Sequence, residues 1–150
     1  MNTKASQEET VSSKLIDRWN QVSKKLAALA EEVPENRFHY RPADDVRTFE
    51  EVLRHVAFWN AYVRDVALGR KADDQANEIS EDKASTKKQI IDALKTTSAA
   101  ASDALRSTRG GLSPQTAELV VTFIEHNCEH YGQLVVYARL NKIVPPVSRN

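Results

Sequence analysis

The chain has 150 residues, and a hydrophobic fraction of 41% is enough for the core of one ordinary domain, expected over residues 1–150. Lys plus Arg number 21 and Asp plus Glu number 21, so no net charge draws the chain to nucleic acid or to an acidic membrane surface. The single cysteine, Cys128, has no internal disulfide partner, and no apolar run reaches the ~20 residues that span a bilayer. We therefore expect a soluble, cytoplasmic protein.

Four segments carry apolar side chains at the three- and four-residue spacing that is typical of amphipathic helices. The first runs from about residue 7 to residue 33, with an apolar stripe that starts at Val11, and Pro34 prevents its continuation. The second covers about residues 48–69, with a stripe that ends at Val66. It opens on a capping-box pattern at residues 48–51 and stops at Gly69.

The last two helices are expected at about residues 86–108 and 114–141. The fourth begins cleanly, because Ser113 is a good N-cap and Pro114 suits the first helical position. Between the helices, residues 34–47 carry two aromatic side chains and are expected to pack, whereas the polar residues 70–85 are expected to be mobile. Four helices of this length predict an all-α four-helix bundle, and the length of the second connection permits a crossover.

His126 and His130 are four residues apart in the fourth helix, which stacks both rings on one face. At 100° per residue the pair falls at the middle of the apolar stripe, among Leu119, Phe123, Leu134 and Tyr137. Two imidazoles in a core are costly unless their nitrogens are satisfied, and a metal ion satisfies them. The pattern lacks the glutamate of HExxH proteases, so a zinc protease is not indicated.

His55 lies beside the stripe of the second helix and is the candidate third ligand, since three histidines with an open fourth position are typical of catalytic sites. Spacing alone leaves open the alternative that His55 is a hydrogen-bonded core residue. His39, in the first connection, is interpreted as a surface residue. Cys128 falls on the opposite side of its helix from the histidine pair and is interpreted as a small buried apolar residue.

Five further side chains are candidates for the surroundings of a metal. Glu129 and Gln133 flank the histidine pair and could hold an imidazole in place, although residues at such positions more often belong to a solvated helix face. Trp59, Tyr62 and Phe123 could line a pocket above the metal, although aromatic residues at helical spacing more often belong to the core. No catalytic acid or base is evident in the ligand pattern.

Three sequence blocks resemble the DinB superfamily, and the resemblance covers nearly the whole chain. They are residues 41–43 (RPA), residues 46–56 (VRTFEEVLRHV) and residues 125–134 (EHNCEHYGQL), followed by residues 141–146 (NKIVPP). The resemblance implies a bundle of up-down-down-up topology that is often homodimeric. It also implies a divalent metal, typically nickel or zinc, held by histidines that align with His55, His126 and His130.

Some members of that superfamily are transferases or isomerases that use low-molecular-weight thiols such as bacillithiol or mycothiol. The resemblance implies a metal-binding protein, and the missing acid or base in the ligand pattern favours a metal-dependent enzyme that transfers a thiol to a small electrophile. We expect a small molecule as its partner and neither nucleic acid nor membrane. Two alternatives remain: a non-catalytic metal- or ligand-binding protein of a stress response, and a metal-dependent hydrolase.

Overall fold

The computed structural model describes residues 10–149, which form four long helices and two short 3-10 turns. The long helices are α1 (Val11–Glu32), α2 (Phe49–Ala67), α3 (Lys87–Arg106) and α4 (Pro114–Leu140). The short turns are η1 (Glu35–Arg37) and η2 (Pro146–Ser148). The expectation of an all-α four-helix bundle is confirmed.

The ends of the helices follow local capping chemistry. Thr48 and Thr86 each complete a capping box with the residue three positions later, and Ser113 caps α4 ahead of Pro114. The first helix begins later than the predicted residue 7, because Thr10 has extended backbone angles and its hydroxyl accepts from the amide of Ser13. Residues 7–9 of that prediction lie outside the described residues.

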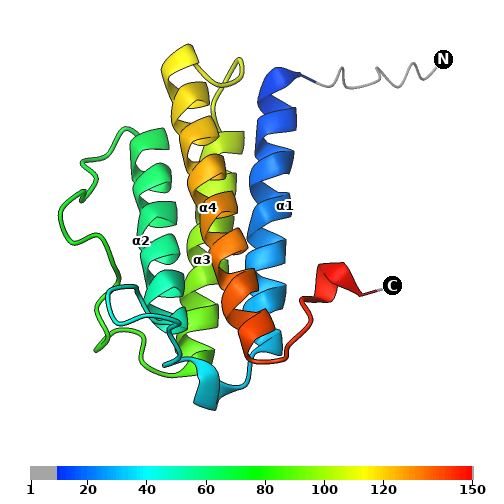
Figure 1. Cartoon of the computed structure of the whole chain (residues 1–150). Coiled ribbons are helices and arrows are strands. Elements are labelled where there is room, and N and C mark those ends of the chain that lie inside the picture. Colours follow the sequence, from blue (N-terminus) through cyan, green and yellow to red (C-terminus); the bar gives the residue numbers. More distant parts are fainter. Residues whose placement is uncertain (1–9, 150) are drawn as a thin grey trace.

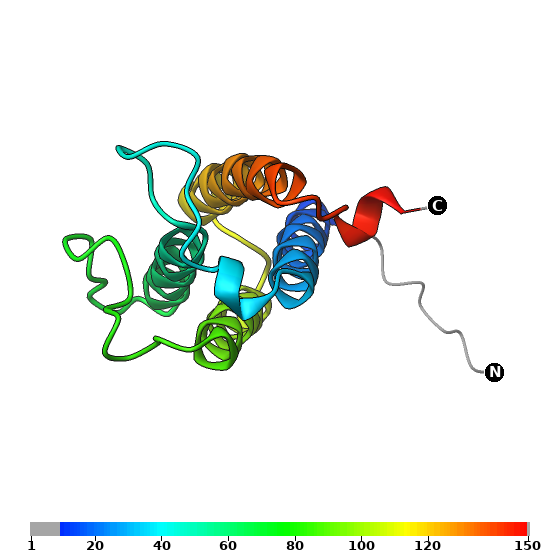
Figure 2. The same cartoon turned by 60° about the horizontal axis from the view of Figure 1, so that its bottom comes forward.

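The helices stand at the corners of a square, with α1 beside α3 and α4, and α2 beside the same two helices (Figure 2). In Figure 1, α1 and α4 run downward while α2 and α3 run upward, which is the up-down-down-up arrangement. Because α2 and α3 are parallel neighbours, the chain between them must return along the length of the bundle. Residues 68–86 form this connection on the outer side of α2. None of the described helices is apolar over a length that would cross a membrane.

The core consists of two apolar clusters with a polar layer between them along α2 and α4. One cluster includes Val56 of α2 and Leu134 of α4, and the other includes Val63 and Val120 of the same two helices. Between these levels lie buried polar side chains. Burying polar groups is costly unless each is hydrogen-bonded, so this polar layer is the first place to look for a functional site.

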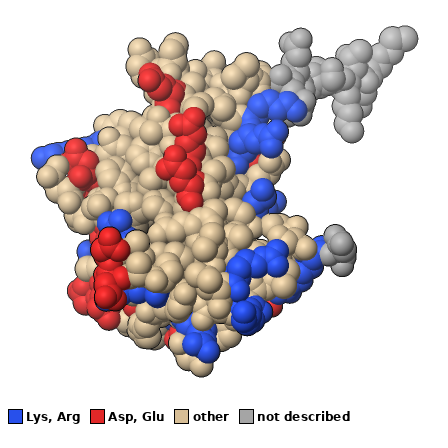
Figure 3. Space-filling view, viewed as in Figure 1, with Lys and Arg blue, Asp and Glu red and all other residues tan. Residues whose placement is uncertain are grey.

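Two apolar positions of the predicted stripes are exposed. Val11 stands in the first turn of α1, and Val66 stands near the end of α2. Phe38 is buried against Phe49, with ring centroids 5.2 Å apart, so the prediction of a packed first connection is confirmed. On the face drawn in Figure 3, basic and acidic side chains are interspersed among uncharged ones, as expected of a chain with balanced charge.

Candidate metal centre

The three predicted histidines meet in the polar layer between α2 and α4. Nε2 of His55 lies 2.9 Å from Nε2 of His126, and one ring nitrogen from each of the three histidines lies within 4.8 Å of the others. The ring centroid of His130 is 4.8 Å from that of His55 and 4.5 Å from that of His126. His55 is buried, and the other two rings are half-buried.

Nδ1 of both His55 and His126 faces an oxygen that accepts a hydrogen bond. His55 Nδ1 is 2.7 Å from the main-chain oxygen of Asn77, which can only accept, so this nitrogen carries a hydrogen. His126 Nδ1 is 3.0 Å from Oδ1 of Asn127. The amide of Asn127 is oriented by its own donation from Nδ2 to Oδ1 of Asn60, at 3.1 Å, and both asparagines are 1% exposed. His126 is therefore also protonated at Nδ1.

A chain of hydrogen bonds fixes the ring of His130 in the same way. The main-chain oxygen of Arg47 accepts from the hydroxyl of Tyr137 at 2.8 Å, so the Tyr137 oxygen is free to accept in turn. It accepts from Nε2 of Gln133 at 2.9 Å, which turns Oε1 of Gln133 toward His130 Nδ1, also at 2.9 Å. His130 therefore donates through Nδ1, which leaves Nε2 as its nitrogen for a metal.

All three rings thus carry hydrogen on Nδ1, so that Nε2 is the nitrogen with the lone pair whenever the ring is neutral. Burial is the main reason why the pKa of His55 is lowered to about 4 and why the pKa of His126 is also lowered. The positive charge of Arg47 acts in the same direction on both rings, whereas the carboxylate of Glu129 acts in the opposite direction on His126. The two rings are therefore neutral near pH 7, and their Nε2 lone pairs face each other at 2.9 Å. Two lone pairs at this distance repel unless a cation lies between them.

The donor set fits a divalent metal ion. Nitrogens that bind one zinc ion at ~2.0–2.1 Å each stand roughly 3 Å apart, close to the separation of the two Nε2 atoms. A histidine that binds a metal through one ring nitrogen usually donates a hydrogen bond from the other nitrogen to an oxygen, as all three rings do in this site. Imidazole suits zinc and nickel, among other metals, so the geometry fits a group of metals and does not select one of them.

The aromatic candidates gather on one side of the histidines. The rings of Trp59 and Phe123 are stacked, with their centroids 5.4 Å apart. The ring centroid of Tyr62 is 5.1 Å from that of Trp59 and 5.6 Å from that of Phe123. Phe123 is 5.6 Å from the ring of His126. All three aromatic side chains are half-buried, so they form a partly open apolar wall beside the histidine cluster.

The polar candidates divide into one that contacts a histidine and one on the surface. Gln133 is bonded to His130, whereas Glu129 is exposed.

His39 is on the surface as predicted, with 76% of its side chain exposed. Cys128 does lie away from the histidines, beside Lys25 and Tyr131, but it is exposed, so the interpretation of a buried residue is wrong. Its side of α4 faces a surface hollow instead of the core.

Asn77 is the contact that the sequence did not reveal. It lies in the polar connection of residues 68–86, and its role rests on a main-chain oxygen, which every residue has. The roles of Asn127 and Tyr137 could have been predicted from the sequence, because each residue lies on the histidine face of α4 or next to it. A search for amide and hydroxyl side chains near the histidine pair on this helix would have found both.

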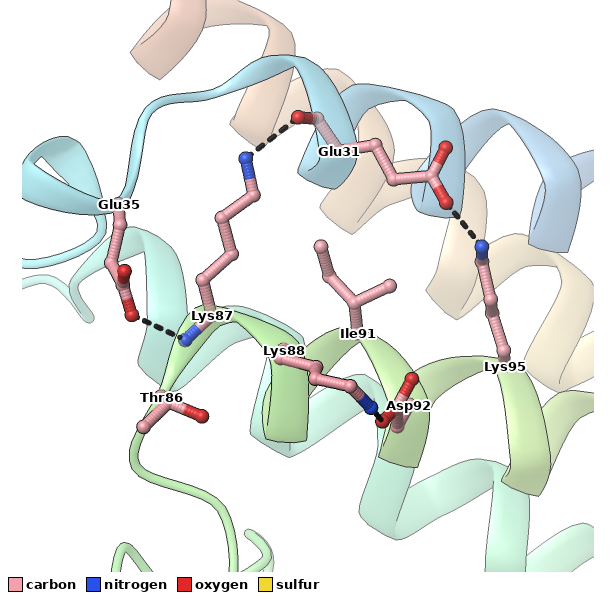
Figure 4. Close-up of a pocket in the computed structure, with 8 residues that line it drawn as sticks. All are labelled: Glu31, Glu35, Thr86, Lys87, Lys88, Ile91, Asp92 and Lys95. Carbon is pink, nitrogen blue, oxygen red and sulfur yellow. Dashed lines mark hydrogen bonds and ion pairs between the residues drawn. The ribbon is translucent and has the colours of Figure 1, made fainter.

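A second hollow, of about 540 Å³, lies between the end of α1 and the start of α3 (Figure 4). It contains none of the three histidines and is lined by Glu31, Glu35, Thr86, Lys87, Lys88, Ile91, Asp92 and Lys95. Its charged groups have partners within the protein: Lys88 pairs with Asp92, Lys95 pairs with Glu31, and Glu35 accepts from the amide of Lys87. Paired charges at a helix junction serve the fold, so we assign this hollow no ligand.

Lys87 closes the end of α1, and its replacement is expected to destabilise the protein. Its Nζ donates to the main-chain oxygens of Glu31 and Val33, both at 2.7 Å, which would otherwise lack partners at the helix end. We expect Lys87→Met to lower the free energy of unfolding by about 1–2 kcal/mol in urea titration. Lys88→Met is the matched control, since this side chain is 85% exposed, and a loss there as large as at Lys87 would contradict the assignment.

Comparison with known proteins agrees with the geometry. A family profile described as the DinB superfamily matches residues 18–134, a span that includes all three histidines. No curated protein matches the chain.

Proposed function

The chain belongs to the DinB superfamily, and on that premise we propose that His55, His126 and His130 bind one divalent metal ion in an enzyme that transfers a low-molecular-weight thiol to a small electrophile. Nickel and zinc are the ions favoured by the resemblance. The observation that carries the metal site is the common state of the three rings: each donates from Nδ1 to an oxygen, which leaves the Nε2 lone pairs to converge.

The reaction needs a nucleophilic sulfur and a place for the electrophile. A divalent ion held by the three nitrogens supplies a Lewis acid that lowers the pKa of a thiol, so that the thiolate forms at neutral pH. In the transfer, the sulfur forms a bond to the electrophilic carbon and the bond from that carbon to its leaving group breaks. The leaving group departs with the bonding electron pair, and the thiol proton passes to solvent.

Two features of this chain support an anionic thiol and an apolar electrophile. The positive charge of Arg47 lowers the pKa of His55, so it also favours an anion beside that ring. The aromatic wall of Trp59, Tyr62 and Phe123 offers a partly open apolar surface next to His126, which suits an uncharged electrophile.

The function is tested by presenting several thiols to the metal-loaded protein. We expect bacillithiol or mycothiol, assayed beside glutathione and cysteine, to react with chlorodinitrobenzene at least about tenfold faster in the presence of the wild type than in the presence of His126→Ala, measured as thioether absorbance. If no thiol reacts faster with the wild type than with that variant, the transferase assignment is wrong for this electrophile class, and a panel of epoxides and alkyl halides extends the test.

The same preparations separate the alternatives. Metal-dependent hydrolysis of p-nitrophenyl acetate without any thiol, together with no thiol transfer, would identify a hydrolase. A metal-loaded protein that is inert in both assays would be a non-catalytic metal-binding protein. Each of these results leaves the metal site in place and removes the thiol chemistry.

A further inference from the structure

The connection of residues 68–86 is hydrogen-bonded to the histidine cluster at Asn77. We propose that Asn77 is a positioning residue: its main-chain oxygen holds His55 in the tautomer and orientation that a metal needs, and its side chain holds Trp59 in the aromatic wall. This inference rests on the metal site of the proposed function and is independent of the reaction carried out there.

Asn77 bonds to two side chains that stand one turn apart on α2. Its main-chain oxygen is 2.7 Å from Nδ1 of His55, and its Oδ1 accepts from Nε1 of Trp59 at 2.9 Å. Positions 55 and 59 lie on the same face of the helix, so one residue of the connection spans both. His126 and His130 receive their oxygen partners from α4 itself, whereas His55 has its partner on another segment of the chain.

The residues after Asn77 fasten the connection to the same stretch of α2. Oε1 of Glu78 accepts from Nε of Arg54 at 2.9 Å, and the amide of Ile79 donates to the main-chain oxygen of Arg54 at 3.3 Å. Arg54 is buried, and it also contacts the main-chain oxygen of Ala84. Three consecutive residues of the connection are therefore anchored, although the polar sequence of residues 70–85 predicted a mobile segment.

The backbone at Asn77 explains why this side chain stands there. Its φ is 62°, in the left-handed region that most residues avoid and that asparagine tolerates. With that turn, the main-chain oxygen faces His55 while the side-chain oxygen of the same residue faces Trp59. Only glycine would keep this turn as readily, and it would lose the bond to Trp59.

Without its partner, the ring of His55 has no fixed tautomer. A hydrogen on Nε2 in place of Nδ1 would put a donor where a metal needs a lone pair, and the ring would be free to turn about χ2. Oxygen partners of metal-binding histidines typically contribute roughly 10- to 100-fold to metal affinity. The anchored connection is thus a third wall of the metal site, beside α2 and α4.

A pair of substitutions at one position separates the main-chain contact from general damage. Asn77→Pro fixes φ near roughly −65° and forbids the turn, whereas Asn77→Gly keeps the turn and removes only the side chain. We expect the proline variant to bind zinc about 10- to 100-fold more weakly in competition with a chromophoric chelator, and the glycine variant to stay within about threefold of the wild type. Lys71→Pro, at an exposed position of the same connection, is the control for a proline as such.

A second measurement does not depend on bound metal or on turnover. The ¹⁵N shifts of the His55 ring in the metal-free protein are expected to show hydrogen on Nδ1 in the wild type and in Asn77→Gly, and hydrogen on Nε2 in part of the Asn77→Pro molecules. The proposal is overturned if wild-type His55 carries its hydrogen on Nε2, or if Asn77→Pro binds zinc as tightly as Lys71→Pro. It is equally overturned if the glycine variant loses as much affinity as the proline variant.

Trp59 reports on the side-chain contact. Trp19 is fully buried, so a change in tryptophan emission on substitution of Asn77 comes from Trp59, which is half-buried. We expect a red shift in Asn77→Gly, because the indole loses its acceptor and meets more water, and no shift in Lys71→Pro. Inactivity of the wild-type protein in the thiol assays would leave all of these readouts intact, so failure of the proposed function and failure of this inference are distinguishable.

Discussion

The His126→Ala variant is expected to lose the metal and, with it, the stabilisation that metal gives the wild type. A ligand present at about 100 times its dissociation constant stabilises a fold by ~2.7 kcal/mol, which for a chain of this size shifts the melting temperature by roughly 5–10 °C. We therefore expect chelator to lower the melting temperature of zinc- or nickel-loaded wild type by that amount, and to leave His126→Ala unchanged. Elemental analysis of both purified proteins gives the bound metal directly.

His39→Ala is the matched control for this experiment, because it removes a histidine that is 76% exposed and outside the cluster. It should bind metal as the wild type does and respond to chelator in the same way. Equal metal content in His126→Ala and in the wild type would contradict the site. So would a wild-type melting temperature that chelator leaves unmoved, since the three converging nitrogens would then have to be satisfied within the protein.

Replacement of Arg54 is expected to have the largest effect on stability. Its guanidinium lies 2.9 Å from Glu78 and 3.6 Å from Glu50, and Glu50 is itself buried. Removing one member of a buried ion pair leaves the other charged and desolvated, which typically costs about 3–5 kcal/mol. We expect Arg54→Met to lower the free energy of unfolding by about 3 kcal/mol in urea titration.

The control for that substitution is Arg64→Met on the same helix, where the pair with Asp65 is partly exposed and worth at most ~1 kcal/mol. Adding Glu50→Gln to Arg54→Met should restore part of the loss, because the unpaired charge is then removed. If Arg54→Met and Arg64→Met are equally stable, the buried network does not carry the stability we assign to it.

The fold and two of the three histidines could be predicted from the sequence because their signals are local. Capping residues such as Thr48 and Ser113 fix where helices begin through contacts within one turn. His126 and His130 lie on one helix, so the rotation of about 100° per residue was enough to put both rings on the same inward side. The exposure of Cys128 shows the limit of that argument, since helical phase gives a direction and says nothing of how far the neighbouring helix reaches.

The rest of the site depends on which segments meet, and one sequence carries little of that information. His55 is separated by 71 positions from His126, and its assignment came from the resemblance to the DinB superfamily, not from its spacing. Neither helical spacing nor the family resemblance could have identified Asn77. It acts largely through a main-chain oxygen, it lies in a polar segment without periodicity, and its distance along the chain from His55 is 22 positions.

The anchoring of residues 77–79 has a consequence for how this chain can change in length. A connection of this kind usually tolerates insertions and deletions anywhere along it. In this chain, a residue added between Asn77 and Ile79 would change which main-chain groups bond to α2. A residue added among the exposed positions 73–75 would only lengthen the loop that precedes the anchored residues 77–79. The crossover therefore behaves as two short independent loops joined at a fixed point, and variation in length among related chains should collect on either side of Asn77.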